Sequence, residues 1–158
     1  MKTHSQKNWT VLVAVMAALG TVAGCNSTPA SSTGGAYDQA PIGFTQQVTL
    51  SGANEVPPVD TSATATGSVT INADHSVSAR IVATGMTATV AHIHLGAAGT
   101  NGPVIVPFTK TAGNTFIADG GPKMTPEQYA AFKAGNTYVN VHSDAHKTGE
   151  IRAQLKGS

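Results

Sequence analysis

Short runs of alternating apolar and polar residues, separated by turn-forming residues, dominate the chain from Phe44 onwards. Because the side chains of a strand alternate between two faces, this pattern is typical of strands that bury one face. Glycine, proline and asparagine lie between the runs, which favours a sandwich or barrel. We therefore predict an all-β fold, a Greek-key β-sandwich or barrel of seven to eight antiparallel strands. The expected strands cover residues 44–50, 67–72, 77–83, 87–95, 104–109, 115–117, 137–142 and 149–155.

One segment departs from the alternating pattern and predicts a short helix. Thr125 can cap its N-terminus, Pro126 occupies the first helical position, and Gly135 follows its last turn. Tyr129 and Phe132 then share one face of the helix. We expect this helix to lay its aromatic rings on the sheet, and we assign it no catalytic role.

The N-terminal part of the chain has the features of a targeting signal. Lys2 and Lys7 precede an apolar, uncharged run over residues 10–22. This run is shorter than the roughly 20 residues that span a membrane, and it is typical of a secretory signal. Cys25 follows small residues, as in the bacterial lipobox that it resembles. We predict a lipoprotein signal peptide over residues 1–24 and lipidation of Cys25, the alternative being an ordinary signal peptide with an incidental cysteine.

Residues 25–43 are rich in serine, threonine, glycine and proline, a composition typical of a flexible tether. The folded domain is expected over residues 44–158. Lipidation of Cys25 would attach it to a membrane through acyl chains only. We expect the protein in the cell envelope, on the periplasmic side, and Asn26 after the cysteine favours the outer membrane. Copper can occur as Cu(II) in such an oxidising compartment.

Composition excludes several classes of partner and site. Charged residues make up 11% of the chain and the formal net charge is +1, with no basic cluster, so no nucleic-acid partner is expected. The single cysteine excludes a disulfide framework and a zinc finger. No nucleophile motif is present, so no catalytic residue is assigned.

Four of the histidines lie in two short segments. His92 and His94 are two residues apart in an expected strand, so both point to the same face. His142 ends a later expected strand, and His146 follows it in a loop. Imidazoles without a thiolate suit copper or zinc better than calcium or magnesium. We predict a site for copper, with zinc as the alternative, formed by these four histidines. The competing interpretation is that they are hydrogen-bonded residues that hold loops together.

Three motifs in this order resemble the CHRD (chordin-type) domain, over about residues 44–156. They cover residues 50–58, residues 91–104, and residues 138–142 together with 149–155. The resemblance implies a secreted or lipid-anchored β domain in bacteria. In animals the related domain is part of chordin, an extracellular antagonist of growth factors. The resemblance therefore implies a fold and a compartment but little chemistry.

A weaker similarity relates the histidine segments to copper/zinc superoxide dismutase. It implies His92, His94 and His142 as copper ligands and Arg152 as the arginine that guides superoxide. The zinc-ligand loop and the cysteine pair of that family have no counterpart here. The simpler interpretation of Arg152 is an exposed pair with Glu150, worth about 0–1 kcal/mol.

Three hypotheses about function follow from these observations. The first is a copper-binding lipoprotein of the cell envelope that acts in copper storage, delivery or tolerance. The second is a copper-dependent enzyme like superoxide dismutase. The third is an extracellular protein-interaction module that holds no metal. Glu55 is interpreted as a structural turn or capping residue rather than a catalytic acid.

Overall fold

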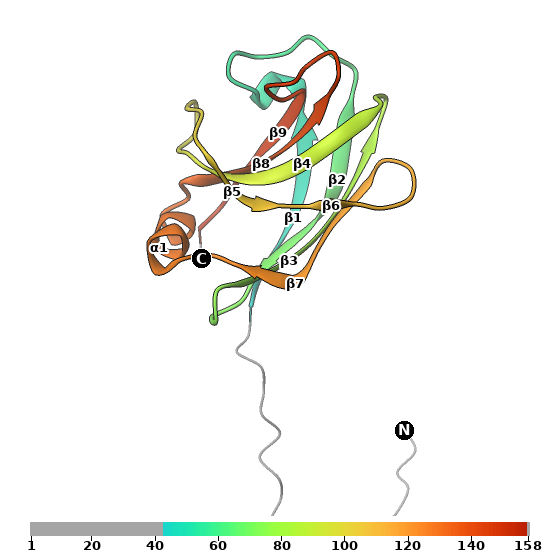
Figure 1. Ribbon diagram of the computed structural model, residues 1–158. Coiled ribbons are helices and arrows are strands. Elements are labelled where there is room, and N and C mark those ends of the chain that lie inside the picture. Colours follow the sequence, from blue (N-terminus) through green and yellow to red (C-terminus); the bar gives the residue numbers. More distant parts are fainter. Residues whose placement is uncertain (1–42, 158) are drawn as a thin grey trace, which may run out of the picture. The chain divides into compact units, whose positions relative to one another are not determined.

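Antiparallel strands make up most of residues 43–157, the part of the chain that the computed structural model describes (Figure 1). The predicted signal peptide, the lipidation of Cys25 and most of the tether lie outside these residues. The strands are β1 (Phe44–Ser51), β2 (Thr64–Ile71), β3 (Ser76–Thr84), β4 (Ala88–Leu95), β5 (Val104–Pro107), β6 (Thr109–Lys110), β7 (Thr115–Lys123), β8 (Thr137–Ser143) and β9 (Ile151–Leu155). They form one sheet in the order β5-β4-β8-β9-β1-β2-β3-β7-β6, so the all-β prediction is confirmed.

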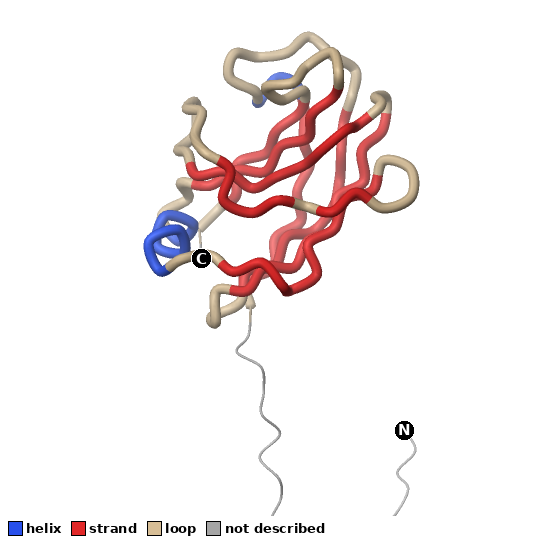
Figure 2. Tube along the Cα trace, in the orientation of Figure 1, coloured by secondary structure: helices blue, strands red, loops and turns tan. Residues whose placement is uncertain are grey.

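The sheet curls into a nearly closed barrel (Figure 2), and its two end strands, β5 and β6, are consecutive in the chain. Phe108 alone separates β5, which pairs with β4, from β6, which pairs with β7. Its backbone N–H donates to the carbonyl of Ala91 in β4 at 3.0 Å. Closure removes the exposed strand edges that an open sheet would leave. The barrel interior holds the apolar core, whose fully buried members include Leu50, Ile71, Val77, Ile81, Ile93, Val106, Phe116, Val139, Ile151 and Leu155.

The structure differs most from the predicted strands in two places, while β2 begins three residues earlier than expected and β9 two residues later. The expected strand over residues 104–109 is divided by Phe108 into β5 and β6, so nine strands are present where seven to eight were expected. The strand expected to end at residue 117 continues to Lys123. Its pairing with β3 shifts register between Ser76 and Ser78, which gives Gly120 and its neighbours room to form a bulge.

The predicted helix is confirmed as α1 (Pro126–Lys133), and a short 3-10 helix η1 (Gly52–Asn54) follows β1. Thr125 and Gln128 form a capping box, in which each side chain accepts a hydrogen bond from the other residue's backbone N–H. Phe132 is buried, and Tyr129 packs against the core. Within the described residues, no helix has the length and apolar character needed to cross a membrane.

Candidate metal centre

The outer face of β4, β8 and β9 carries polar side chains in rows. His92 pairs with Asn140, which pairs with Arg152 on the next strand. The neighbouring row starts at His94 and continues through Tyr138. Residues of the opposite parity, such as Ile93 and Val139, point into the core and are fully buried. The period-two pattern therefore places the histidines of β4 on the face that lies away from the core.

Three of the four predicted ligands lie together on this face. His92, His94 and His142 each offer one ring nitrogen, and these nitrogens all lie within 4.8 Å of one another. The closest pair is His92 Nδ1 and His142 Nε2, which are 3.2 Å apart. Ligand atoms about 2.0–2.1 Å from a tetrahedral metal ion are about 3.3 Å from each other, so this spacing fits two ligands of one ion.

Two backbone carbonyls fix which nitrogen of each ring carries the proton. His94 Nδ1 lies 2.9 Å from the carbonyl oxygen of Gly102, and His142 Nδ1 lies 2.9 Å from that of Lys147. A carbonyl only accepts, so each Nδ1 donates and each Nε2 keeps its lone pair. His94 Nε2 is buried and has no hydrogen-bond partner among the described residues. An unsatisfied buried acceptor costs about 1–3 kcal/mol, a cost that a bound cation would remove.

The environment of the histidine cluster favours the neutral form of His92 and His142. The pKa of His92 falls from 6.5 to about 4, mainly because the ring is buried and also because His142 and His94 lie beside it. Burial also lowers the pKa of His142, although the Lys147 carbonyl opposes this effect. A metal ion binds the neutral form of imidazole, so these two rings need not lose a proton to bind one near pH 7.

The two other histidines among the described residues, His75 and His146, are not part of this cluster. His146 is in the loop after β8, where its backbone N–H donates to the carbonyl of Ser143 at 3.2 Å; its role as a ligand remains a prediction. His75 occupies the turn between β2 and β3 with a positive φ of 69°. Its ring stacks on Tyr129 at a centroid distance of 4.3 Å.

The structure corrects the interpretation of Arg152 as half of an exposed pair with Glu150. Arg152 is only 1% exposed, and its guanidinium lies 3.4 Å from the centre of the Tyr138 ring. The Tyr138 ring also stacks on the His94 ring, at a centroid distance of 4.8 Å. The guanidinium donates to Ala97 O, Thr100 O, Asn101 Oδ1 and Gln154 Oε1. Arg152 therefore holds the loop over residues 96–103 against the cluster and supports one of its rings.

Comparison with known protein families gives one match. The model of the CHRD domain family matches residues 46–155. The chain belongs to the CHRD domain family. Membership indicates an extracellular or envelope β domain. No curated protein and no solved structure matches the chain.

Two polar residues of this CHRD domain were missed by the sequence analysis as parts of the site. Asn140 is 1% exposed, and its Oδ1 lies 3.0 Å from His142 Nε2. Its position two residues before His142 in a strand was a signal, because it places both side chains on the same face. Glu55, interpreted as a turn residue, is 6% exposed. Its backbone N–H caps η1. Its carboxylate lies near the Asn140 amide, since both groups border the space beside Gly149.

Burial also shifts the pKa of Glu55 in the CHRD domain. Burial raises the pKa of its carboxyl, while the positive charge of Arg152, the N–H of Val56 and the amide of Asn140 act in the opposite direction. Gly149 makes room for this arrangement, because a Cβ there would lie 2.5 Å from Glu55 Oε1 and 2.7 Å from Asn140 Nδ2. Glu55, Asn140 and the histidine cluster thus form one continuous polar layer under the loops.

Proposed function

We propose that the protein is a copper-binding lipoprotein of the cell envelope that acts in copper storage, delivery or tolerance. Its ligands are His92, His94 and His142. The observation that carries the proposal is the pair of Nε2 lone pairs, on His94 and His142, that are held unprotonated by hydrogen bonds at the opposite ring nitrogens. One of them, His94 Nε2, is buried without a partner. A cation that accepts lone pairs satisfies both.

Copper is favoured by the chemistry of the donors. Three neutral imidazoles suit copper, zinc and nickel, and Cu(II) binds most tightly of the divalent ions to a given set of nitrogen donors. Zinc is the alternative ion. The predicted lipid on Cys25 would keep the site in an oxidising compartment, at the surface of a membrane.

Superoxide dismutation by the bound copper is a second candidate. It is favoured by the partial exposure of His92, which leaves one side of the cluster less covered than His94 and His142. The proposed guiding role of Arg152 receives no support, since its guanidinium lies against Tyr138 and bonds loop carbonyls. Superoxide consumption by copper-loaded protein, measured against an equal concentration of free copper, decides this candidate.

Copper titration of the full-length protein tests the first proposal. We expect one equivalent of Cu(II) per chain in competition with a chelator of known affinity. His92→Ala and His142→Ala should each weaken binding at least a hundredfold, because each removes a ligand from a three-histidine site. His75→Ala is the matched control, because His75 stacks on Tyr129 outside the cluster. Unchanged affinity in both cluster variants would show that the metal hypothesis is wrong and would favour an interaction module.

A further inference from the structure

The contact between Asn140 and His142 does not fit an ordinary hydrogen bond. Asn140 Oδ1 lies 3.0 Å from His142 Nε2, but the proton of that ring is on Nδ1, which donates to Lys147. An amide oxygen and an unprotonated ring nitrogen are both acceptors. A metal ion bound by both atoms removes the conflict.

Turning the amide over would relieve this contact but create another. The Asn140 NH₂ group would then face His142, and the amide oxygen would face the carboxylate of Glu55. In the orientation of the structure, the Asn140 NH₂ group instead lies on the Glu55 side, since a Cβ added at Gly149 would lie 2.7 Å from Asn140 Nδ2 and 2.5 Å from Glu55 Oε1. Glu55 Oε1 is buried without any other hydrogen-bond partner among the described residues, so a donor is favoured on that side and a second oxygen is not. Both residues are buried, with 1% and 6% of their surfaces exposed, so water is poorly placed to separate two oxygens. Glu55 therefore selects the orientation that points Oδ1 at the histidines.

We propose that Asn140 Oδ1 is a fourth protein donor to the metal, and that Glu55 is the positioning residue that keeps it aimed at the cluster. This inference rests on the proposed three-histidine copper site and defines its chemistry further. The Oδ1–Nε2 distance of 3.0 Å is close to the spacing of about 3.3 Å expected for two ligands of one tetrahedral ion. Asn140 lies next to the cluster on the same strand, whereas His146 lies in the following loop.

An oxygen donor changes which oxidation state the site prefers. Cu(I) favours soft sulfur ligands, whereas amide oxygens suit harder, divalent ions. A site with three nitrogens and one oxygen should therefore select Cu(II) or Zn(II) over Cu(I). The protein would hold copper in the oxidised form in which an oxidising compartment supplies it.

Paired affinities for Cu(II) and Cu(I) test the fourth donor in the full-length protein. Asn140→Ala should weaken Cu(II) binding about 10- to 100-fold and Cu(I) binding less than about threefold, which lowers the selectivity for the oxidised ion. Asn140→Asp keeps an oxygen donor but also places an oxygen against Glu55, so we expect it to retain wild-type Cu(II) affinity only when Glu55 is replaced as well. Asn114→Ala is the control, because that amide bonds Met86 and Ala88 outside the site.

Glu55→Gln tests the positioning role separately. A neutral amide can face Asn140 with its oxygen or its NH₂ group, so the Asn140 orientation is no longer enforced. We expect about tenfold weaker Cu(II) binding. Combining Glu55→Gln with Asn140→Asp should restore the affinity, because the aspartate offers oxygen in either orientation. A role for Glu55 in folding alone would not give this rescue.

A measurement on the wild type avoids any variant that fails to fold. In ¹⁵N-labelled protein, one equivalent of Zn(II) should shift the side-chain NH₂ signals of Asn140 strongly and leave those of Asn114 in place. Unmoved Asn140 signals, or wild-type Cu(II) affinity in folded Asn140→Ala, overturn the fourth donor alone. Loss of affinity in His146→Ala but not in Asn140→Ala gives that role to His146. A wild type that binds neither ion overturns the histidine site itself.

Discussion

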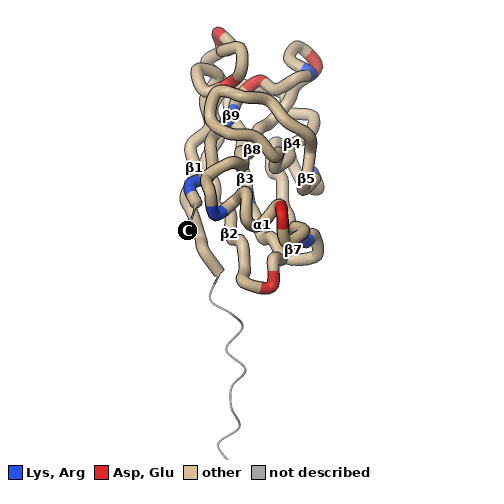
Figure 3. Tube along the Cα trace, turned by 90° about the vertical axis from the view of Figure 1, so that its left-hand side faces the viewer, with Lys and Arg blue, Asp and Glu red and all other residues tan. Residues whose placement is uncertain are grey.

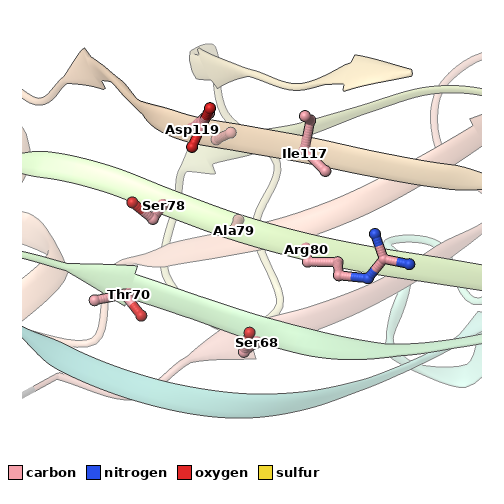
Figure 4. Close-up of a pocket in the computed structure, with 8 residues that line it drawn as sticks. Ser68, Thr70, Ser78, Ala79, Arg80, Ile117 and Asp119 are labelled. Carbon is pink, nitrogen blue, oxygen red and sulfur yellow. The ribbon is translucent and has the colours of Figure 1, made fainter. Parts of the chain in front are cut away.

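The barrel has two outer faces with different chemistry, although both are built from alternating strands. The face of β2, β3 and β7 carries Ser68, Thr70, Ser78, Arg80 and Asp119, whose side chains stand separately on neighbouring strands (Figure 4). The face of β4, β8 and β9 carries three histidines and an asparagine that contact one another. It also carries Arg152, which contacts the Tyr138 ring that stacks on His94. The two faces share a strand pattern and differ in what covers them.

The face of β2, β3 and β7 (the hydroxyl face) is open to solvent, whereas loops cover the face of β4, β8 and β9 (the histidine face). Exposed hydroxyls such as Thr45 and Thr70, which are 2.8 Å apart, can bond each other or water at little cost. On the histidine face, the loop over residues 96–103 and the segment after β1 exclude water. Polar groups buried in this way must satisfy each other or bind an ion. A candidate site therefore differs from a solvated surface in that its polar side chains are buried and lie close together. Polarity alone does not make this distinction.

Charge distribution supports the same distinction. Lysine, arginine, aspartate and glutamate are few and scattered over the described residues (Figure 3). The one ion pair found among them joins Lys123 to Asp74 at 2.9 Å, with both side chains exposed. Arg152, Glu55 and Glu150 are the exceptions, since all three are buried.

Replacing the arginine of each face should give the largest contrast. Arg152→Ala removes a buried cation and leaves the carbonyls of Ala97 and Thr100 without their donor. We expect a loss of about 3–5 kcal/mol in the free energy of unfolding. Arg80→Ala, on the exposed hydroxyl face, should change it by less than about 0.5 kcal/mol. Urea denaturation of both variants measures the contrast. Similar losses of unfolding free energy would show that the two faces do not differ in how far loops bury their side chains.

The sequence predicted the strands of both faces but only part of the site. Alternation placed His92 and His94 on one side of a strand, because side-chain parity is local. It could not show that His142 meets them, because that depends on the pairing of Val90 with His142 across β4 and β8. The burial of Glu55 could not be predicted from the sequence either. The position of this side chain depends on how the segment after β1 folds over β9. The alternation of side chains along the strand was enough to predict that Asn140 lies on the same face as His142.

Replacing one glycine of each face by alanine should give a smaller contrast in stability than replacing the arginines. Gly149 has a φ of +133°, and a Cβ there would overlap Glu55 and Asn140. Gly149→Ala should cost about 1–3 kcal/mol and weaken copper binding as well, because the added methyl displaces the polar layer. Gly121, in β7, has nothing within 4 Å of an added Cβ, so Gly121→Ala should leave both properties near their wild-type values. Thermal denaturation and the copper competition titration measure the two effects, and equal behaviour of the two variants would contradict a packed polar layer.

The titration of His92 should give the smallest effect, in metal-free protein. Burial holds its pKa at about 4, against 6.5 in the unfolded chain. Between these values the unfolded state binds a proton that the folded state does not, so the stability that His92 contributes is present above pH 6.5 and declines as the pH falls towards 4. Because the ring is partly exposed to solvent, we expect a decline of about 1–2 kcal/mol rather than the full shift. Urea midpoints of wild type and His92→Gln at pH 7 and pH 4.5 isolate this contribution, since other titrating groups are common to both proteins. The variant should lose less stability than the wild type on acidification, and an equal loss would mean that the ring is solvated like the hydroxyls of the opposite face.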